Sequence, residues 1–245
     1  MKTLRKTTLS LFTLLSLLVL TGCASTSLSQ QTYDDHISAD PFVKTNRAIH
    51  SFNDSVDKAV LKPVAKVYSN YVPLLFQAGI NNFLNNLGEP VSFVNNILQL
   101  KVEDSLITFS RFAFNTTLGL GGLVDVTGLG GVEEQDEDFG QTLAYWGVKP
   151  GPYIVLPFLG PSNLRDAVSL IPDRVVNNEF LDAVTADSIT EPVLVLNFLD
   201  TRASLLSLEK VIEQQIDPYS FFKSAYEQNR ISAIYDGDPP DADNF

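Results

Sequence analysis

Apolar residues recur at three- and four-residue spacing through the first half of the chain, which is the period of an amphipathic helix. The pattern begins after Asp40-Pro41, a carboxylate followed by proline that is typical of a helix start. Pro63, Pro73 and Pro90 each precede a further helical stretch, so the sequence predicts short helices broken at these prolines. The apolar faces are Ile49, Phe52, Val56 and Val60; Ile80, Phe83, Leu84 and Leu87; Phe93, Val94, Ile97 and Leu98; and Val102, Leu106, Phe109 and Ala113.

A second helical block follows residue 162. Ser162 is expected to cap a helix through Leu170, and apolar residues continue on helical spacing from Leu194 to Ile216. Asp217-Pro218 repeats the start pattern for a last helix that ends at about Ala233. Such faces fit either a water-soluble helical core or helices that lie in a membrane interface.

The region between the two blocks, residues 112–164, is rich in glycine. Ten of the 14 glycines fall between Gly119 and Gly160, and the runs 112–124 and 150–164 carry no charge. Neither run reaches the roughly 20 apolar residues of a membrane-spanning helix. Between them, residues 133–138 hold five acids, which we expect to stay in water. The pattern predicts a Gly-rich amphipathic hairpin that dips into a bilayer and packs against protein; a Gly-rich surface loop is the alternative.

The N-terminus has the form of a lipoprotein processing segment. Three basic residues precede the apolar run Leu9–Leu20, and the run ends in Leu20-Thr21-Gly22-Cys23, which resembles a bacterial lipobox. We therefore expect residues 1–22 to be removed and Cys23 to be the lipid attachment site, with an ordinary signal peptide as the alternative. Ala24, in place of Asp, resembles the pattern of lipoproteins sorted to the outer membrane.

The remaining chain divides into three parts. Residues 23–39 are rich in Ser, Thr and Gln and are expected to form a flexible tether in which His36 is solvated. Residues 40–235 form the helical domain, and residues 236–245 are expected to be a disordered acidic tail.

Charge and composition exclude several functions. Residues 23–245 carry 14 basic and 29 acidic side chains, which argues against nucleic-acid binding and against a polybasic grip on lipid headgroups. One Cys and two His leave too few ligands for a typical zinc site. No Gly-x-Ser-x-Gly elbow surrounds Ser162, so we expect no catalytic residue, and a lipid-degrading enzyme is the less favoured hypothesis. We also expect no cofactor and no metal.

Many short strings of the chain occur together in one known protein family. They include Asp40-Pro41-Phe42, Asn46-Arg47, Phe52-Asn53, Leu61-Lys62-Pro63, Asn86-Leu87-Gly88-Glu89-Pro90, Arg111-Phe112, Asp138-Phe139-Gly140-Gln141, Trp146-Gly147-Val148, Gly151-Pro152-Tyr153, Leu159-Gly160-Pro161-Ser162, Leu164-Arg165-Asp166 and Asp217-Pro218-Tyr219. With these strings in the expected order over about residues 40–170, and a weaker likeness to about residue 230, the chain resembles the MlaA (VacJ) family of outer-membrane lipoproteins.

This resemblance implies an all-α fold, a ring-like set of amphipathic helices in the inner, periplasmic leaflet of the outer membrane of a Gram-negative bacterium. It implies that the protein removes mislocalised phospholipids from the outer leaflet and passes them to a periplasmic carrier (MlaC-like), in complex with a trimeric porin. A polar path is what such transport requires, because a headgroup phosphate without partners is costly to bury in hydrocarbon. A structural or assembly lipoprotein associated with porins is the alternative.

The resemblance also implies site residues. Phe52 and Asn53 match a stretch near the family's channel, and residues 115–125 match the hairpin thought to line and gate it; simple turn formation is the alternative for the glycines. The segment 139–202 resembles the porin-facing region, although Arg165 and Asp166 also fit a charge pair at a helix start. The candidate residues are Phe52, Asn53, Asn115, Gly119, Gly121, Gly122 and Asp125 for the lipid path, and Phe139, Trp146, Tyr153 and Arg165 for the porin face.

Overall fold

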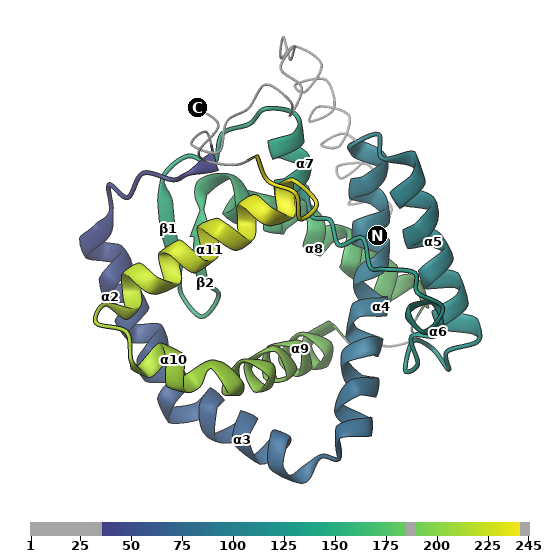
Figure 1. The fold of residues 1–245 in the computed structure, drawn as a ribbon, viewed down its shortest axis with the longest axis horizontal. Coiled ribbons are helices and arrows are strands. Elements are labelled where there is room, and N and C mark those ends of the chain that lie inside the picture. Colours follow the sequence, from purple (N-terminus) through teal and green to yellow (C-terminus); the bar gives the residue numbers. More distant parts are fainter. Residues whose placement is uncertain (1–35, 185–189, 241–245) are drawn as a thin grey trace, which may run out of the picture.

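The fold, seen in a computed structural model that describes residues 36–184 and 190–240, is a ring of helices around a central gap (Figure 1). The expected predominantly helical fold is confirmed, with one short antiparallel hairpin added. The elements are α2 (Val43–Val56), the π-helical segment η3 (Asp57–Leu61), α3 (Lys62–Tyr71), α4 (Leu74–Leu98), α5 (Val102–Thr117), α6 (Val126–Leu129), α7 (Phe139–Tyr145), β1 (Tyr153–Leu156), β2 (Gly160–Asn163), α8 (Leu164–Val184), α9 (Thr190–Ser204), the 3-10 segment η4 (Leu205–Leu208), α10 (Glu209–Glu213) and α11 (Pro218–Ile234).

The three prolines that the sequence places at helix breaks, Pro63, Pro73 and Pro90, differ in their effect on the helices. Pro73 separates α3 from α4, as the sequence predicts. Pro63 stands in the first turn of α3 directly after η3, and a wide π-helical turn gives its ring room beside the preceding carbonyls, so the chain continues as helix. The predicted break at Pro90 is wrong, because Pro90 lies inside the 25-residue helix α4.

Two predicted helix starts also shift. Helix α2 begins at Val43 and not at Pro41, because Asp40 accepts a hydrogen bond from the Asn46 side chain instead of capping the helix. At α8, Ser162 belongs to β2, and the Asn163 side chain accepts from the backbone N–H of Asp166 in the capping geometry.

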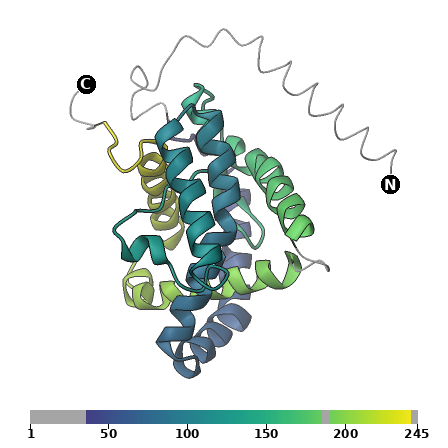
Figure 2. The same cartoon turned by 90° about the vertical axis from the view of Figure 1, so that its right-hand side faces the viewer.

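Helices α4 and α5 pack side by side, as Figures 1 and 2 show, and their polarity is inverted relative to a water-soluble pair. The predicted apolar stripe of α5 lies on the surface: Val102, Leu106 and Phe109 are 69, 65 and 55 % exposed. Apart from Leu84, the buried side chains of the two helices and of Gln99, which caps α4, are polar: Asn86, Glu89, Ser92, Asn95, Asn96 and Gln99 on the α4 side, and Ser105, Thr108, Arg111 and Asn115 from α5. The apolar stripe of α5 therefore lies at the protein surface and does not form a hydrophobic core.

Apolar side chains pack in small clusters rather than in one core. Ala65, Tyr68 and Ala203 join α3 to α9, and Tyr153, Val155 and Tyr219 join β1 to α11. In the described chain, 22 polar or charged side chains are buried against 11 apolar ones, whereas 37 large apolar side chains are exposed. Polar contacts consequently carry much of the packing.

The Gly-rich region 112–164 is divided into two features. Its first run completes α5 and turns back through residues 118–125, and its second run forms the β1–β2 hairpin, in which Tyr153 pairs with Asn163 and Leu156 with Gly160. The acids between them do not all stay in water, because Glu137 is buried and binds Lys101, Gln99 and Gln141. No described helix is both long and apolar enough to cross a bilayer.

The folded domain extends beyond the predicted residues 40–235 at both ends. The prediction that His36 is solvated is wrong, because His36 and Ser38 are buried and the His36 ring lies edge-on to Tyr235. At the other end, Asp236 is held by Lys101 at 2.6 Å rather than lying in a free tail. Residues 23–35 of the predicted tether, Cys23 among them, and residues 241–245 lie outside the described residues.

The close packing of α3 on α9 gives a first test. Ala65 is fully buried beside Ala203, so an Ala65→Leu side chain has no space, and we expect the free energy of unfolding to fall by about 1–3 kcal/mol. Thermal unfolding followed by circular dichroism in detergent measures it, with Ala78→Leu, at an exposed position of α4, as the control. Equal stability of the two variants would contradict the packing described.

Candidate functional site

A buried ion pair links α4 to α5. The Arg111 Nε donates to Glu89 Oε1 at 2.8 Å, and the two side chains are only 4 and 2 % exposed. Arg111 also donates to the Val132 carbonyl at 2.7 Å and reaches Thr127 and Asp125 at 3.3 and 3.2 Å, so one guanidinium joins α4, α5, α6 and the segment after α6. Burial raises the pKa of Glu89 to about 7, and the contact with Arg111 limits that rise.

The turn after α5 is built on the same cluster. Asn115 donates from Nδ2 to Asp125 at 2.8 Å and accepts from the backbone N–H of Thr127. Asp125 caps α6 through the Gly128 N–H; burial opposes its ionisation, but these donors and Arg111 hold its pKa below the ordinary value. Asn115 and Asp125, predicted for the lipid path, thus meet in one polar cluster, and their contacts link the end of α5 to the start of α6.

The glycines of this turn have different roles. Gly119 leaves no space for a side chain, because a Cβ there would overlap the carbonyl oxygens of Val124 and Asn115. Gly122 has a φ of +95°, and its Cβ would lie 2.7 Å from the Asn86 side chain. Gly121 has a φ of +76° but open space around it. The turn therefore requires glycine at 119 and 122 and favours it at 121. That these glycines also line a lipid path stays a prediction.

Asn53 and Phe52 lie on α2, away from this polar cluster, and the exposed Phe52 ring lies edge-on to Phe158. The Asn53 side chain donates to the Leu156 carbonyl at 2.9 Å and accepts from the Phe158 N–H at 2.8 Å. Two helical turns earlier, Asn46 makes the same double contact with Tyr153 and Val155, so two asparagines of α2 satisfy the free edge of β1. Figure 1 shows α2 and the hairpin across the central gap from α5 and α6, so the candidate lipid-path residues form two separate groups.

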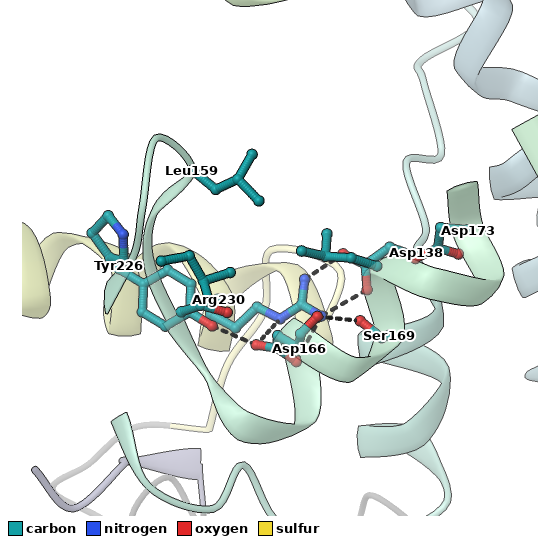
Figure 3. Close-up of a pocket in the computed structure, with 11 residues that line it drawn as sticks. Asp138, Leu159, Asp166, Ser169, Asp173, Tyr226 and Arg230 are labelled. Carbon is teal, nitrogen blue, oxygen red and sulfur yellow. Dashed lines mark hydrogen bonds and ion pairs between the residues drawn. The ribbon is translucent and has the colours of Figure 1, made fainter. Parts of the chain in front are cut away.

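A pocket of about 270 Å³ lies between the β1–β2 hairpin, α8 and α11 (Figure 3). Arg230 is at its base, bound to the Asp138 carboxylate by two nitrogens and to Asp166 at 2.9 Å. Its other lining residues are Leu156, Leu159, Pro161, Ser162, Ser169, Leu170, Asp173 and Tyr226. The pocket therefore combines charged groups with apolar walls, which suits an amphipathic molecule.

The electrostatics of the pocket are set by burial and by Arg230. Burial opposes the charge on Asp166, but Arg230 and Arg165 outweigh it and hold the pKa of Asp166 below its ordinary value. Burial raises the pKa of Asp173 to about 6, and hydrogen bonds from the Phe139 N–H and Asn95 limit the rise. The sequence did not reveal this pocket, because its charged residues are spread over more than 90 positions with no local spacing that joins them.

Two candidate porin contacts are not accessible. Tyr153 is 1 % exposed within the β1–α11 cluster, and Arg165 is 5 % exposed and paired with Asp166, as the alternative of a charge pair at a helix start predicts. Phe139 is half-buried at the start of α7, and Trp146 is 42 % exposed with its indole N–H on the Leu98 carbonyl. Only the latter two keep surface for a partner. Within residues 36–184 and 190–240, no group of three or more His, Cys, Asp and Glu side chains is placed to hold a metal ion.

Comparison with known proteins gives consistent matches. A family model described as MlaA lipoprotein matches residues 38–233. The Escherichia coli intermembrane phospholipid transport system lipoprotein MlaA is 36% identical over 218 residues, covering 86% of this chain and 82% of that protein. The Haemophilus influenzae protein of the same name is 34% identical, covering 95% and 92%. A solved structure, described as the structural basis for maintenance of bacterial outer membrane lipid asymmetry, is 34% identical with a TM-score of 0.71 and covers 82% of this chain and 100% of that chain.

The buried carboxyls predict an unusual pH dependence. Glu89, Glu137 and Asp173 have raised pKa values of about 7, 7 and 6, so between about pH 4.5 and 7 the folded chain keeps protons that the unfolded chain releases. We expect the melting temperature to fall as pH rises through this window. Glu89→Gln should reduce the fall, and Glu103→Gln, at an exposed position of α5, should not. A melting temperature that rises from pH 5 to 8 would contradict these environments.

The glycine turn gives a second test. Gly122→Ala combines a left-handed backbone with a clash against Asn86, so we expect a loss of about 2–4 kcal/mol in the free energy of unfolding. Gly121→Ala is the matched control: it has the backbone strain without the clash and should lose about 1 kcal/mol. Denaturant titration of both variants compares them, and a larger loss at Gly121 would rule out the close approach of Gly122 to α4.

Proposed function

The chain belongs to the MlaA lipoprotein family, and we propose that it removes phospholipids that have strayed into the outer leaflet of the outer membrane and passes them towards the periplasm. Support comes from the relatives, which are named as intermembrane phospholipid transport system lipoproteins, and from the matching structure, which concerns outer-membrane lipid asymmetry. In this proposal the protein maintains lipid asymmetry as a transporter, with no catalytic step.

The inverted polarity of the helices is the observation that carries the proposal. Large apolar side chains are exposed on α3, α4, α5 and α8, and we call this set the apolar belt: Val64, Val67, Tyr71, Leu74, Leu75, Phe76, Ile97, Leu98, Val102, Leu106, Phe109, Val168, Ile171 and Val175. Water is a poor solvent for such a surface, because each Leu or Phe costs about 1.5–3 kcal/mol to expose fully. Lipid acyl chains are a good solvent for it, so the ring is proposed to lie within one leaflet.

The ring and its pocket support the handling of a whole lipid. A phospholipid has a charged headgroup that needs polar partners and acyl chains that prefer the bilayer. In this proposal the headgroup passes through protein, where polar side chains are available as partners, while the acyl chains stay in hydrocarbon beside the apolar belt. The pocket at Arg230 has both kinds of surface, with charged groups at the base and Leu156, Leu159 and Leu170 in its walls.

Attachment and partners complete the proposal. We propose that Cys23 is acylated and anchors the chain in the periplasmic leaflet of the outer membrane. A trimeric porin is proposed to bind beside Phe139 and Trp146, and an MlaC-like periplasmic carrier is proposed to receive the lipid. The partly exposed Trp146 ring supports this face, since tryptophan is enriched in protein interfaces.

The test measures phospholipid in the outer leaflet of cells that lack the protein, using a phospholipase that acts only on surface-exposed lipid. We expect the outer-leaflet phospholipid to rise in the deletion strain and to return to normal with the wild-type chain. Cys23→Ala should not restore it. Leu106→Glu/Phe109→Glu should restore it poorly, because each carboxylate costs up to about 3 kcal/mol in hydrocarbon.

The matched control places the same two charges on an exposed polar face. Ser51→Glu/Ser55→Glu adds them to α2 and should restore lipid asymmetry fully. If outer-leaflet phospholipid is unchanged in the deletion strain while porin level or envelope integrity falls, the protein is a structural lipoprotein and the transport proposal fails.

A further inference from the structure

The pocket at Arg230 carries an excess of negative charge. Three carboxylates line it, Asp138, Asp166 and Asp173, against the single guanidinium of Arg230 (Figure 3). Arg165 pairs with Asp166 at 2.8 Å from outside the lining and supplies a second positive charge. Three negative and two positive charges leave one carboxylate uncompensated when all are ionised.

Asp173 is the uncompensated carboxylate. The ion pairs of Arg230 go to Asp138 and Asp166, and Asp173 takes part in none of the ion pairs of the described residues. Its Oδ1 accepts a hydrogen bond from Asn95 Nδ2. The Phe139 N–H is shared between Oδ1 and Oδ2, each at 3.1 Å, and among the described residues it is the one hydrogen-bond donor that reaches Oδ2. Oδ2 therefore retains room for a donor, and a cation is the partner that a half-buried carboxylate favours most.

The neighbouring groups define what kind of cation fits. Asp166, Ser169 and Asp173 follow one another at helical spacing along the pocket side of α8. Ser169 and Ser162 donate their hydroxyl protons to the carbonyls of Asp166 and Asn163, so their lone pairs remain as acceptors. A primary ammonium has three N–H donors to place on such oxygens. A quaternary ammonium has none, and Tyr226, whose hydroxyl is bound to Asp166, is the one aromatic ring of the lining.

Anions are disfavoured in the same pocket. A phosphate would have to compete with Asp138 and Asp166 for Arg230, which already donates to both carboxylates. It would also stand beside Asp173 and suffer like-charge repulsion. The walls of Leu156, Leu159, Pro161 and Leu170 add apolar surface at the entrance, where Leu159 is 45 % exposed.

We propose that this pocket binds the primary ammonium of a phospholipid headgroup, as in an ethanolamine phospholipid, with Asp173 as its counter-ion. The inference rests on the proposed lipid transport and adds a headgroup preference to it. The apolar walls contact the lipid next to the headgroup, and the phosphate stays outside the carboxylate cluster. Choline and glycerol headgroups enter less favourably, because they offer no ammonium N–H.

The experiment measures lipid bound to the purified full chain in detergent at pH 7.5. The probe is an equimolar mixture of phosphatidylethanolamine, phosphatidylcholine and phosphatidylglycerol with identical acyl chains, and native mass spectrometry counts each bound lipid. We expect the ethanolamine lipid to be bound about tenfold over either competitor, the size of one charge-assisted hydrogen bond. Asp173→Asn should bring the ratio close to one while total bound lipid is kept.

Controls separate charge from folding. Asp173→Glu keeps the carboxylate and should keep a clear preference for the ethanolamine lipid. Asp182→Asn removes an exposed carboxylate of the same helix outside the pocket and should behave as the wild type. Melting temperatures of all three variants show whether a lost preference comes with a lost fold. Free O-phosphoethanolamine at equal concentration should not displace the lipid, because it has no acyl chains for the apolar walls.

The possible outcomes are distinct. Equal binding of the three lipids by the wild type, or an unchanged preference in a folded Asp173→Asn variant, overturns the headgroup inference while lipid transport stands. Displacement by free O-phosphoethanolamine overturns the assignment to a lipid and leaves a site for small amines. Failure of the wild type to bind any of the lipids counts against the proposed function itself, and the inference falls with it.

Discussion

The guanidinium of Arg111 places a full positive charge between α4 and α5, and the surrounding structure depends on its compensation. Glu89 neutralises it from α4, the Val132 carbonyl and Thr127 accept its remaining protons, and Asp125 approaches from the cap of α6. A buried charge without such partners would cost several kcal/mol. The pair therefore determines how the helices face each other: their polar sides turn inward, and Leu106 and Phe109 are left outside.

A protein with a polar interior cannot rely on hydrophobic burial alone, and the ring is joined by directional contacts instead. Asn46 and Asn53 fix the edge of β1 to α2, Arg202 joins α9 to Asp57 and Glu209, and Arg230 ties α11 to α7 and α8. Such contacts specify geometry closely, because each donor must meet its acceptor. Many polar side chains are buried while many large apolar side chains are exposed, an arrangement that suits a protein surrounded by lipid.

Much of this was predictable from the sequence. Helical spacing located most helices, and α11 ends within one residue of the prediction. The short uncharged runs excluded spanning segments, and the many matched strings identified the family. Helix boundaries were less predictable where tertiary contacts replaced local ones, as for Asp40, which binds Asn46 instead of capping α2. Pro90 lies within α4, directly after Glu89, which forms the buried ion pair with Arg111 of α5.

The sequence by itself determined the helical period, the positions of the apolar faces and the need for glycine where the chain turns back. Only the tertiary structure decided which side of each helix faces inward, because an apolar stripe has the same period whether it meets a protein core or lipid. It also decided which charges meet. Asp138, Asp166, Asp173 and Arg230 come from three separate stretches, and only the folded ring brings them into one pocket, where distance and burial, rather than spacing along the chain, set their interactions.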